Sequence, residues 1–417
     1  MTAPKLRFKE FDEDWAASRI DEIASVTSGG TPSRSNSEYW DGNIPWVTTS
    51  LVDFNVIQTA EEFITQDGLK NSSAKLFPKN TILMAMYGQG ITRGKVAILG
   101  IEATTNQACC AIKLNNSFDT HFIFQNLMNR YEEIRDLSND GGQKNLSAGI
   151  IKEIEVVSPS KEEQTKIATF LSTVDEKISQ LSQKLHLLGQ YKQGIMQKLF
   201  NQQIRFKADD GSEFGDWIKV KFSESFVFHN TNSYSRALLA EVGEVMNIHY
   251  GDIHTKFSML FDVSKEIVPF LNDQIDSTKI AENQFLREGD LVIADASEDY
   301  KDIGKAIEVV HLNNQKVVAG LHTYIARPIQ PFALGFCGYL MQTFEVREQI
   351  KKLATGISVL GISKTNIGKV EIKLPCLEEQ TKIANFLSSI DQKIDVVSEQ
   401  LEQAKLWKKG LLQQMFV

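Results

Sequence analysis

The chain has 417 residues, and its hydrophobic content of 42% is ample for packed cores in two or three domains. Its net charge of −8 argues against a nucleic-acid binder that is basic over a whole domain, so any contact with DNA must use local basic faces or a more basic partner. No apolar run approaches the roughly 18 residues of a membrane span, and the first residues are charged rather than apolar, so we expect a cytoplasmic protein that does not enter a membrane.

The first domain, 1–159, is predicted to mix strands and helices. Apolar runs at 82–87 and 95–99 predict two strands that flank a glycine-bearing loop, and 120–136 has a helical pattern. The loop fails the phosphate-loop spacing by one residue, and Val96 stands where a magnesium-binding hydroxyl is needed. We interpret it as a loop that brings hydrogen-bond donors to a DNA backbone or to base edges, with a solvated hairpin as the equal alternative.

Residues 160–201 are predicted to form one long helix. Apolar residues recur with 4-3 spacing from Ile167 to Leu199, interrupted only by Lys192, and this pattern is typical of a coiled-coil seam. Ser160 and Glu163 have the S-x-x-E form of a capping box, in which the hydroxyl and the carboxylate bind free backbone N–H groups.

The helix sequence occurs twice in the chain. Residues 162–200 return without a gap as 378–416, with 19 of 39 positions identical and Lys408 in the place of Lys192. We call the constant step from 162 to 378 the repeat offset. Because the chain between the helices leaves the end of one and returns to the start of the other, a compact domain there favours antiparallel pairing. A pair of separate surface helices and an intermolecular zipper are the alternatives.

The antiparallel coiled coil predicts how the two halves are arranged. Two similar mixed α/β (α+β) domains, separated by the long helices, are expected to show pseudo-two-fold symmetry, with the N-terminus near Val417. With full overlap of the helices, Lys192 is expected near Ala384 and Lys408 near Ala168, where each ammonium can extend to solvent.

The second domain, 202–375, repeats the layout of the first and also opens with a similar short motif. Its expected features are strands at 291–294 and 304–310, a helix at 334–354, and polar loops at 249–256 and 295–300. These polar loops have no equivalent in the other half, which favours two different recognition surfaces on one scaffold over a single active site. Metal binding by His249 and His254 is a minor alternative.

Candidate DNA contacts are polar or aromatic side chains of these loops that can donate or accept hydrogen bonds. In the first half they are Arg34, Tyr87, Gln89, Thr92, Arg93, Lys95, Gln143, Lys144 and Asn145. In the second half they are Tyr250, His254, Thr255, Lys256, Ser297, Tyr300, Lys301, Lys305 and His322. We predict no catalytic residues and no metal ligands.

The paired P-x-x-x-E-Q-x-x-I-A-x-F-L-S-x-x-D-x-K-I runs begin at Pro159 and Pro375. Together with SGGTPS in the first half and YGDIHTKF in the second, they resemble the specificity subunit of Type I restriction-modification systems over essentially the whole length. The resemblance implies two target-recognition domains and two conserved helical regions. We assign them to 1–159 and 202–375, and to 160–201 and 376–417, respectively.

This resemblance implies a DNA-binding subunit without catalysis of its own. It would read a bipartite, asymmetric target in double-stranded DNA, one half by each domain, while the helices set the spacer and hold two methyltransferase (M) and two restriction (R) subunits. No cofactor is expected in this chain, and S-adenosylmethionine, ATP and magnesium are expected on the partners. The alternatives are a non-catalytic two-domain adaptor and a DNA-acting enzyme with an unrecognised site.

Overall fold

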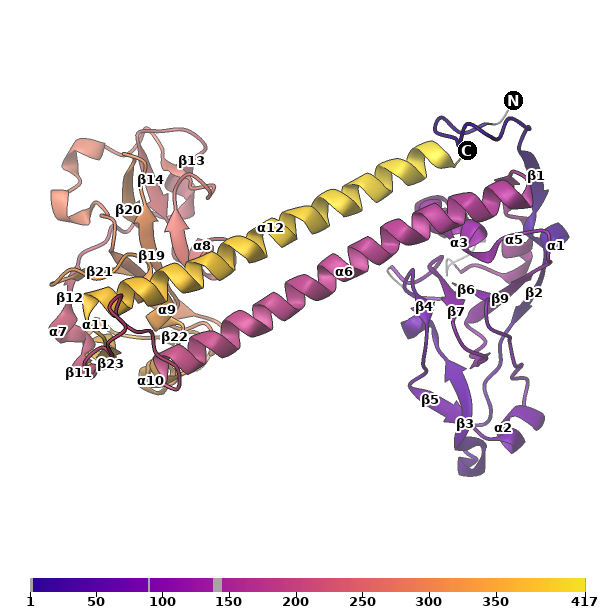
Figure 1. The fold of residues 1–417 in the computed structure, drawn as a ribbon, viewed down its shortest axis with the longest axis horizontal. Coiled ribbons are helices and arrows are strands. Elements are labelled where there is room, and N and C mark those ends of the chain that lie inside the picture. Colours follow the sequence, from indigo (N-terminus) through magenta and orange to yellow (C-terminus); the bar gives the residue numbers. More distant parts are fainter. Residues whose placement is uncertain (1–2, 89–90, 138–144, 417) are drawn as a thin grey trace. The chain divides into compact units, whose positions relative to one another are not determined.

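The computed structural model describes residues 3–88, 91–137 and 145–416 (Figure 1). The chain divides into two compact units: unit 1 comprises Met1–Gln183 and Ser398–Val417, and unit 2 comprises Lys184–Val397. Each unit mixes sheets with helices, so the predicted α/β class is confirmed. Over the described ranges, no helix is both long enough and apolar enough to cross a membrane.

Unit 1 is built on a five-stranded sheet of order β2-β9-β6-β7-β4, in which only the β4–β7 pair is parallel. Its strands are β2 (Ala24–Ser28), β4 (Val56–Ile57), β6 (Ile82–Ala85), β7 (Val96–Leu99) and β9 (Cys109–Leu114). The two predicted strands around the glycine-bearing loop are β6 and β7, and both are completely buried. This confirms the prediction that two strands flank the loop.

The remaining strands of unit 1 form two smaller sheets. One has the order β5-β3-β8 and the other pairs β1 with β10. These strands are β1 (Ala16–Arg19), β3 (Trp40–Val47), β5 (Glu62–Ile64), β8 (Thr104–Thr105) and β10 (Glu155–Ser158). The short helices are α1 (Ile20–Ile23), α2 (Gln66–Lys70), α3 (Thr120–Asn129), α4 (Tyr131–Asp136) and α5 (Ala148–Glu153). The helical pattern at 120–136 is therefore split into α3 and α4 at Arg130, whose backbone leaves the helical region.

Unit 2 repeats this architecture. Its main sheet has the order β12-β21-β17-β19-β15, again with only the last pair parallel. The strands are β12 (Phe226–His229), β15 (Leu260–Asp262), β17 (Leu291–Ala294), β19 (Ala306–His311) and β21 (Thr323–Pro328). The duplication seen in the long helices therefore extends to the main sheets, strand by strand.

The other elements of unit 2 resemble those of unit 1, with the additional strands β13, β18 and β22. A second sheet has the order β13-β16-β14-β20, and β11–β23 and β18–β22 form two-stranded ribbons. These strands are β11 (Ile218–Lys221), β13 (Leu239–Ala240), β14 (Val245–Ile248), β16 (Phe270–Leu271), β18 (Ala296–Ser297), β20 (Lys316–Ala319), β22 (Leu360–Gly361) and β23 (Glu371–Leu374). The helices are α7 (Phe222–Ser225), α8 (Tyr250–Thr255), α9 (Phe336–Met341), α10 (Phe344–Leu353) and α11 (Lys364–Gly368). The helix predicted at 334–354 is thus divided into α9 and α10.

The long helices are α6 (Lys161–Phe200) and α12 (Leu377–Met415), and they pack against each other. In unit 1 the first part of α6 meets the last part of α12, where Phe170 packs edge-on against Trp407, with ring centroids 6.1 Å apart. In unit 2 the last part of α6 meets the first part of α12, where Lys192 pairs with Asp391. The predicted antiparallel pairing is confirmed.

The two seam lysines have acidic partners that were not predicted from the sequence. Lys192 pairs with Asp391, and Lys408 pairs with Asp175 at 2.6 Å, so each partner lies one heptad beyond the expected alanine. Only 24% of the Lys192 side chain and 15% of the Lys408 side chain are exposed. The ammonium groups are held by carboxylates and do not extend freely to solvent, because an ion pair satisfies a half-buried charge that an alanine cannot.

Each long helix is anchored by the same buried ion pair. Arg7 donates two hydrogen bonds of 2.8 Å to Glu163 in unit 1, and Arg205 donates bonds of 3.0 and 2.7 Å to Glu379 in unit 2. Both carboxylates are at most 1% exposed, and the Trp217 indole N–H also donates to Glu379 at 3.0 Å. These hydrogen bonds raise the pKa of both guanidinium groups. The repeated opening motif of each half therefore holds the start of a helix.

The predicted capping box is only half formed. The Glu163 N–H points at the Ser160 hydroxyl at the long distance of 3.5 Å, whereas both carboxylate oxygens of Glu163 accept from Arg7.

The N-terminal segment reaches the end of α12, as expected. The Leu6 N–H donates to the Gln414 carbonyl at 2.9 Å.

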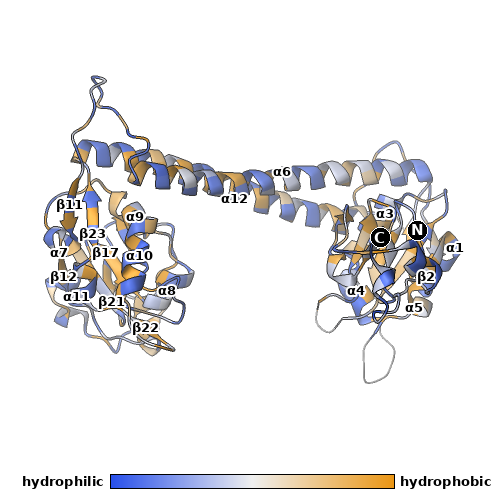
Figure 2. Cartoon of the chain, turned by 90° about the horizontal axis from the view of Figure 1, so that it is seen from below, coloured by the Kyte–Doolittle hydropathy of each residue, from blue (hydrophilic) through white to orange (hydrophobic). Residues whose placement is uncertain are grey.

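Apolar side chains continue from each sheet into the long helices. In Figure 2 the strands of each sheet are mostly hydrophobic, and the long helices mix both kinds of residue. The core of unit 1 includes Ile82 of β6, Leu171 of α6 and Met415 of α12, and the core of unit 2 includes Leu291 of β17 and Leu387 of α12. The helices are therefore part of the domain cores.

Replacing Arg205 with Met should destabilise the protein by about 3 kcal/mol, because Glu379 would remain buried without its charge partner. This is the lower end of the range for a broken buried pair, since 20% of the Arg205 side chain is exposed. Urea unfolding of the full chain measures the change. The matched control is Lys207→Met, whose partner Glu213 is exposed, and it should unfold like the wild type. Equal midpoints for both variants would contradict an anchoring role of the buried pair.

Candidate nucleic-acid interface

In unit 1, the ends of strands from two sheets meet at one place. The Gly30 N–H donates to the Thr105 carbonyl at 2.8 Å, Asn106 N–H to Val47 O at 3.0 Å, and Met86 N–H to the Ala108 carbonyl at 2.8 Å. These bonds link the loops that follow β2, β3, β6 and β8. We call the described residues of these loops the loop end of unit 1, which comprises 29–35, 48–55, 86–88, 91–95 and 106–108.

Unit 2 has an equivalent loop end with the same hydrogen bonds. The Asn232 N–H donates to Ala319 O at 3.1 Å, Gly320 N–H to Ile248 O at 2.9 Å, and Asp295 N–H to the His322 carbonyl at 3.1 Å. The loop end of unit 2 comprises residues 230–236, 249–256, 295–305 and 320–322. The scaffold that presents the loops is thus the same in both units, whereas the loop sequences differ.

Four predicted contact residues from three separate stretches come together at the loop end of unit 2. The ring of Tyr250 lies 5.4 Å from that of His322 and 6.2 Å from that of His254. The Lys305 ammonium donates to the His254 carbonyl at 2.8 Å, and the His254 ring nitrogen Nε2 lies 2.9 Å from the Ala296 carbonyl. The result is an aromatic and cationic cluster on one face of the domain.

An acidic group borders this cluster. Asp295 lies 3.2 Å from the His322 ring nitrogen Nδ1, and burial together with Asp295 raises the pKa of Tyr324 to about 12. Asp295 belongs to the polar loop predicted at 295–300, but neither Asp295 nor Tyr324 was among the predicted DNA contacts. The cluster thus places the Lys305 ammonium and the half-exposed His322 imidazole beside an acceptor carboxylate, which is a mixture of groups that base edges can pair with.

The other predicted residues of unit 2 differ in accessibility. Tyr300 is 54% exposed, and Lys256 and Lys301 are also exposed. Ser297 is 6% exposed, and its hydroxyl exchanges hydrogen bonds with the backbone of Asp299, so it shapes its own loop. The Thr255 hydroxyl donates to the Gly251 carbonyl at 2.8 Å within α8.

The histidine pair considered for a metal site has structural partners. Nδ1 of His249 accepts from the Gly251 N–H at 3.1 Å and caps α8, and burial lowers the pKa of His249, which favours the neutral ring that this bond needs. The nearby Asp252 is 1% exposed and pairs with Arg236 at 2.9 Å and with Lys256 at 3.2 Å. Within the described ranges no group of three His, Cys, Asp or Glu residues could hold a metal ion.

In each unit a hairpin loop connects two antiparallel strands of the main sheet, β6 to β7 in unit 1 and β17 to β19 in unit 2. Both hairpin loops end in a Gly–Lys pair. Gly94 and Gly304 have positive φ angles of 85° and 66°, and Lys95 and Lys305 follow them directly before β7 and β19. The Lys95 ammonium donates to Asp53 at 2.6 Å, much as Lys305 donates to His254. The two lysines therefore tie the hairpin to the loop that follows β3 or β14.

The rest of the predicted set in unit 1 is only partly described. Tyr87 is 42% exposed, Thr92 and Arg93 are partly buried in the hairpin loop, and Asn145 is partly buried ahead of α5. Gln89, Gln143 and Lys144 lie outside the described residues.

Arg34 is held by the small sheet of unit 1. Its guanidinium stacks 3.7 Å from the centre of the Trp40 ring and 4.9 Å from that of Trp46, and both oxygens of Glu62 accept from it. These hydrogen bonds raise the pKa of Arg34 and lower that of Glu62.

Close packing explains a glycine at position 30 of the SGGTPS motif. A Cβ on Gly30 would lie 2.3 Å from the backbone of Ser73, so a larger residue would not fit there.

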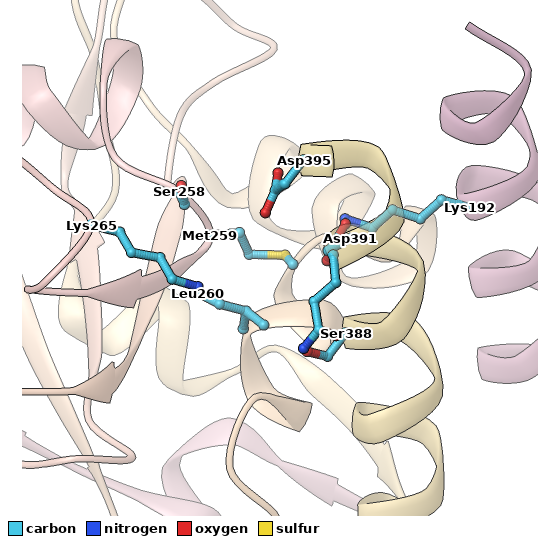
Figure 3. A pocket seen from close by; sticks show the side chains of 9 residues that line it. Lys192, Ser258, Met259, Leu260, Lys265, Ser388, Asp391 and Asp395 are labelled. Atoms are coloured by element: carbon cyan, nitrogen blue, oxygen red, sulfur yellow. The ribbon is translucent and has the colours of Figure 1, made fainter. Parts of the chain in front are cut away.

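A pocket of about 210 Å³ in unit 2 lies against the long helices, apart from the loop end (Figure 3). Its walls are formed by Lys192, Ser258, Met259, Leu260, Lys265, Ser388, Asp391, Gln392 and Asp395. Asp391 accepts from the Tyr339 hydroxyl at 2.6 Å as well as pairing with Lys192, and burial raises the pKa of that hydroxyl. The pocket therefore contains the ion pair that joins the two helices to the domain.

A family model described as Type I restriction modification DNA specificity domain matches residues 12–188 and 216–406. The two matches cover most of the chain, one in each half. The chain belongs to this family of specificity subunits of Type I restriction-modification systems.

Individual proteins are similar over different lengths. The Type I restriction enzyme MjaVIII specificity subunit of Methanocaldococcus jannaschii is 24% identical over 96% of this chain and 91% of its own length. The MjaIX specificity subunit of the same organism is 31% identical over 50% of this chain, and that match spans 49% of the relative. A crystal structure of a Type I restriction-modification system S subunit from M. genitalium has a TM-score of 0.59 at 16% identity and covers 100% of this chain and 99% of that chain, which shows a shared fold.

Proposed function

We propose that this chain reads a bipartite, asymmetric target in double-stranded DNA, with one half-site recognised by each domain. The observation that carries the proposal is that two copies of one scaffold present two different sets of loops. Target-recognition domains at 1–159 and 202–375 and long helices at 160–201 and 376–417 are the division that this function needs. A symmetric site would need like loops, which this chain does not have.

The loop ends carry suitable chemistry for this task. In unit 2, Lys256, Tyr300 and Lys301 are exposed beside the cluster of Tyr250 and His322. Lysines can bind phosphates, while imidazoles and carboxylates can pair with base edges. With a net charge of −8, the chain has little long-range attraction for DNA, so we propose that a more basic partner supplies part of the affinity.

We also propose that the chain does no chemistry itself. Two polar groups of unit 2 that resemble parts of a catalytic centre have structural roles, because His249 caps α8 and Asp252 forms ion pairs with Arg236 and Lys256. S-adenosylmethionine, ATP and magnesium would be bound by partner subunits. This chain would contribute the target sequence alone.

Replacing Lys301 with Ala should weaken recognition of the second half-site only. A base contact should cost about 1–3 kcal/mol, and a phosphate contact should mainly reduce the salt dependence of binding. Arg93→Ala is the counterpart for the first half-site. Replacing Lys95 should likewise affect only the first half-site, and replacing Lys305 only the second. Each of these changes should also loosen the hairpin loop, because each lysine links it to a neighbouring loop.

Fluorescence anisotropy of the assembled complex on DNA with base changes in one half-site measures these effects. Lys279→Ala is the control, because Lys279 is an exposed lysine of unit 2 outside the loop end. If Lys301→Ala impaired both half-sites equally, the domains would not be separate readers.

We further propose that the two helices set the spacer between the half-sites. Inserting one heptad between Leu181 and Leu185, and another between Val397 and Leu401, keeps the seam in register and lengthens the coiled coil by about 10 Å. At about 3.4 Å per base pair this adds roughly three base pairs to the spacer. These pairs also rotate the far half-site by about a third of a turn, so some affinity should be lost.

Sequencing of modified bases in cells that carry the inserted variant decides this prediction. The same half-sites at a longer spacing would support helices as a ruler. The control carries a single insertion in one helix, which breaks the pairing and should abolish modification. Modification by the double variant at the original spacing would show that another part of the complex fixes the distance.

The scaffolding role is supported by two exposed aromatic residues. Tyr191 on α6 is 52% exposed and Trp407 on α12 is 54% exposed, and the repeat offset relates one position to the other. Exposed aromatics are frequent anchors of protein interfaces. Two equivalent anchors suit two copies of one partner, and we propose that they bind the two methyltransferase subunits, with the restriction subunits joining that assembly.

Trp407→Ala should remove one methyltransferase subunit from the complex, and Tyr191→Ala should remove the other. The expected loss of binding free energy per site is about 2 kcal/mol or more, as for aromatic residues that become buried at the centre of an interface. Native mass spectrometry counts the subunits that remain bound. Lys405→Ala, an exposed neighbour on α12, is the control. Two methyltransferase subunits bound with unchanged affinity in the double variant Tyr191→Ala/Trp407→Ala would refute these anchors.

A further inference from the structure

The side chain of Arg347 binds the backbone of the hairpin loop of unit 2. The guanidinium of Arg347, on α10, donates to the carbonyl oxygens of Lys301 at 2.9 Å, Ile303 at 2.7 Å and Gly304 at 3.0 Å. A planar guanidinium with several N–H donors can bind several carbonyl groups at once, which an ammonium does less well. These three carbonyls belong to the turn that carries Lys301 and leads into Lys305.

In unit 1, Tyr131 binds the backbone of the hairpin loop in a similar way. The hydroxyl of Tyr131, on α4, donates to the carbonyl of Ile91 in the hairpin loop. Ile91 precedes Gly94 by three positions, just as Lys301 precedes Gly304 by three. Both glycines have a positive φ angle, so the two bonds meet the same position of the same kind of turn.

Tyr131 and Arg347 are also equivalent in the sequence. The repeat offset of the long helices relates one position to the other, and each lies in the helix that follows the split of the predicted longer helix. The position is thus the same in both units, whereas the side chain differs. The loops that these side chains hold differ as well.

We propose that positions 131 and 347 are positioning sites for DNA specificity. Each fixes the hairpin loop of its own domain through backbone carbonyls, without touching DNA. The proposal rests on the proposed reading of one half-site by each domain. A loop that is fixed before binding loses less conformational freedom on binding, so releasing it lowers affinity and weakens discrimination between bases.

The side chains at this position suit the loop they hold. In unit 2 three carbonyl groups converge on Arg347, and one residue with several donors satisfies them. In unit 1 a single hydroxyl meets a single carbonyl, and the Tyr131 ring also packs 5.2 Å from Phe54 in the neighbouring loop. Phe54 is beside Asp53, the partner of Lys95, so Tyr131 supports two loops of the same loop end.

The test compares Arg347→Met, Arg347→Lys and Tyr131→Phe in the assembled complex. Binding is measured on three DNAs, with the intact target, with base changes in the first half-site and with base changes in the second. Arg347→Met should lose on the order of tenfold in affinity and lose discrimination at the second half-site only. Arg347→Lys should recover part of this loss, and Tyr131→Phe should act on the first half-site only.

Gln349→Ala is the matched control. Gln349 lies on the same helix and exchanges two hydrogen bonds of 2.9 Å with the backbone of Glu371 in β23, so it holds a strand and not the loop. It should leave both half-sites unchanged. Hydrogen exchange at the Asp302 and Lys305 amides should be faster in Arg347→Met than in the wild type or the control.

The outcomes separate the two levels of the proposal. If the wild-type complex does not distinguish changes in the two half-sites, the proposed function fails. If it does, but Arg347→Met and Tyr131→Phe behave like Gln349→Ala or affect both half-sites alike, the positioning role is overturned. Tyr131→Phe removes a single oxygen atom, so this arm remains decisive even if Arg347→Met does not fold.

Discussion

The structure depends on a buried carboxylate near the start of each long helix and on the arginine that neutralises it. Glu163 and Glu379 are almost completely buried, and a carboxylate in that setting is costly unless a cation and hydrogen bonds accompany it. The arginine comes from a segment that lies at the end of the opposite helix: Arg205 follows α6 directly, and the Leu6 N–H beside Arg7 binds α12 at Gln414. One ion pair therefore joins the start of one helix to the end of the other in each unit, which is possible only when the helices are antiparallel.

The repeat made most of this architecture predictable from the sequence. A gapless repeat of the long helix identified two halves, and the apolar runs at β6 and β17 were correctly assigned to strands, which are fully buried in the structure. The ion-pair partners of the seam lysines were not predictable, because Asp391 and Asp175 lie on the polar edge that the apolar heptad pattern leaves out. Very short strands, such as β8 and β16, have no period to detect.

The candidate site was predictable in part. Tyr250, His254, Lys305 and His322 were chosen from polar loops, and the fold brings them together because those loops leave the same ends of neighbouring strands. The residues that hold these loops in place, such as Arg347, were not predicted. Arg347 donates to the backbone carbonyl of Ile303, and a hydrogen bond to the backbone cannot be recognised from the sequence of side chains. Arg34 shows the converse. Its turn-rich surroundings suggested a DNA contact, but two tryptophans and a glutamate from later in the chain already engage its charge, and its contact with DNA stays a prediction.

The equivalent positions of the two halves divide into two kinds. Where one residue type stands in both, as with Glu163 and Glu379 or Gly94 and Gly304, the role is to build the scaffold and a turn on it. Where the residue differs but the role is kept, as with Tyr131 and Arg347, the side chain answers to a loop that is itself different. Under the proposed function, such a domain could acquire a new recognition loop without disturbing the helix anchor or the sheet, provided that the residue that holds the loop changed with it. The backbone of the loop, and not only its side chains, would then be part of what each domain specifies.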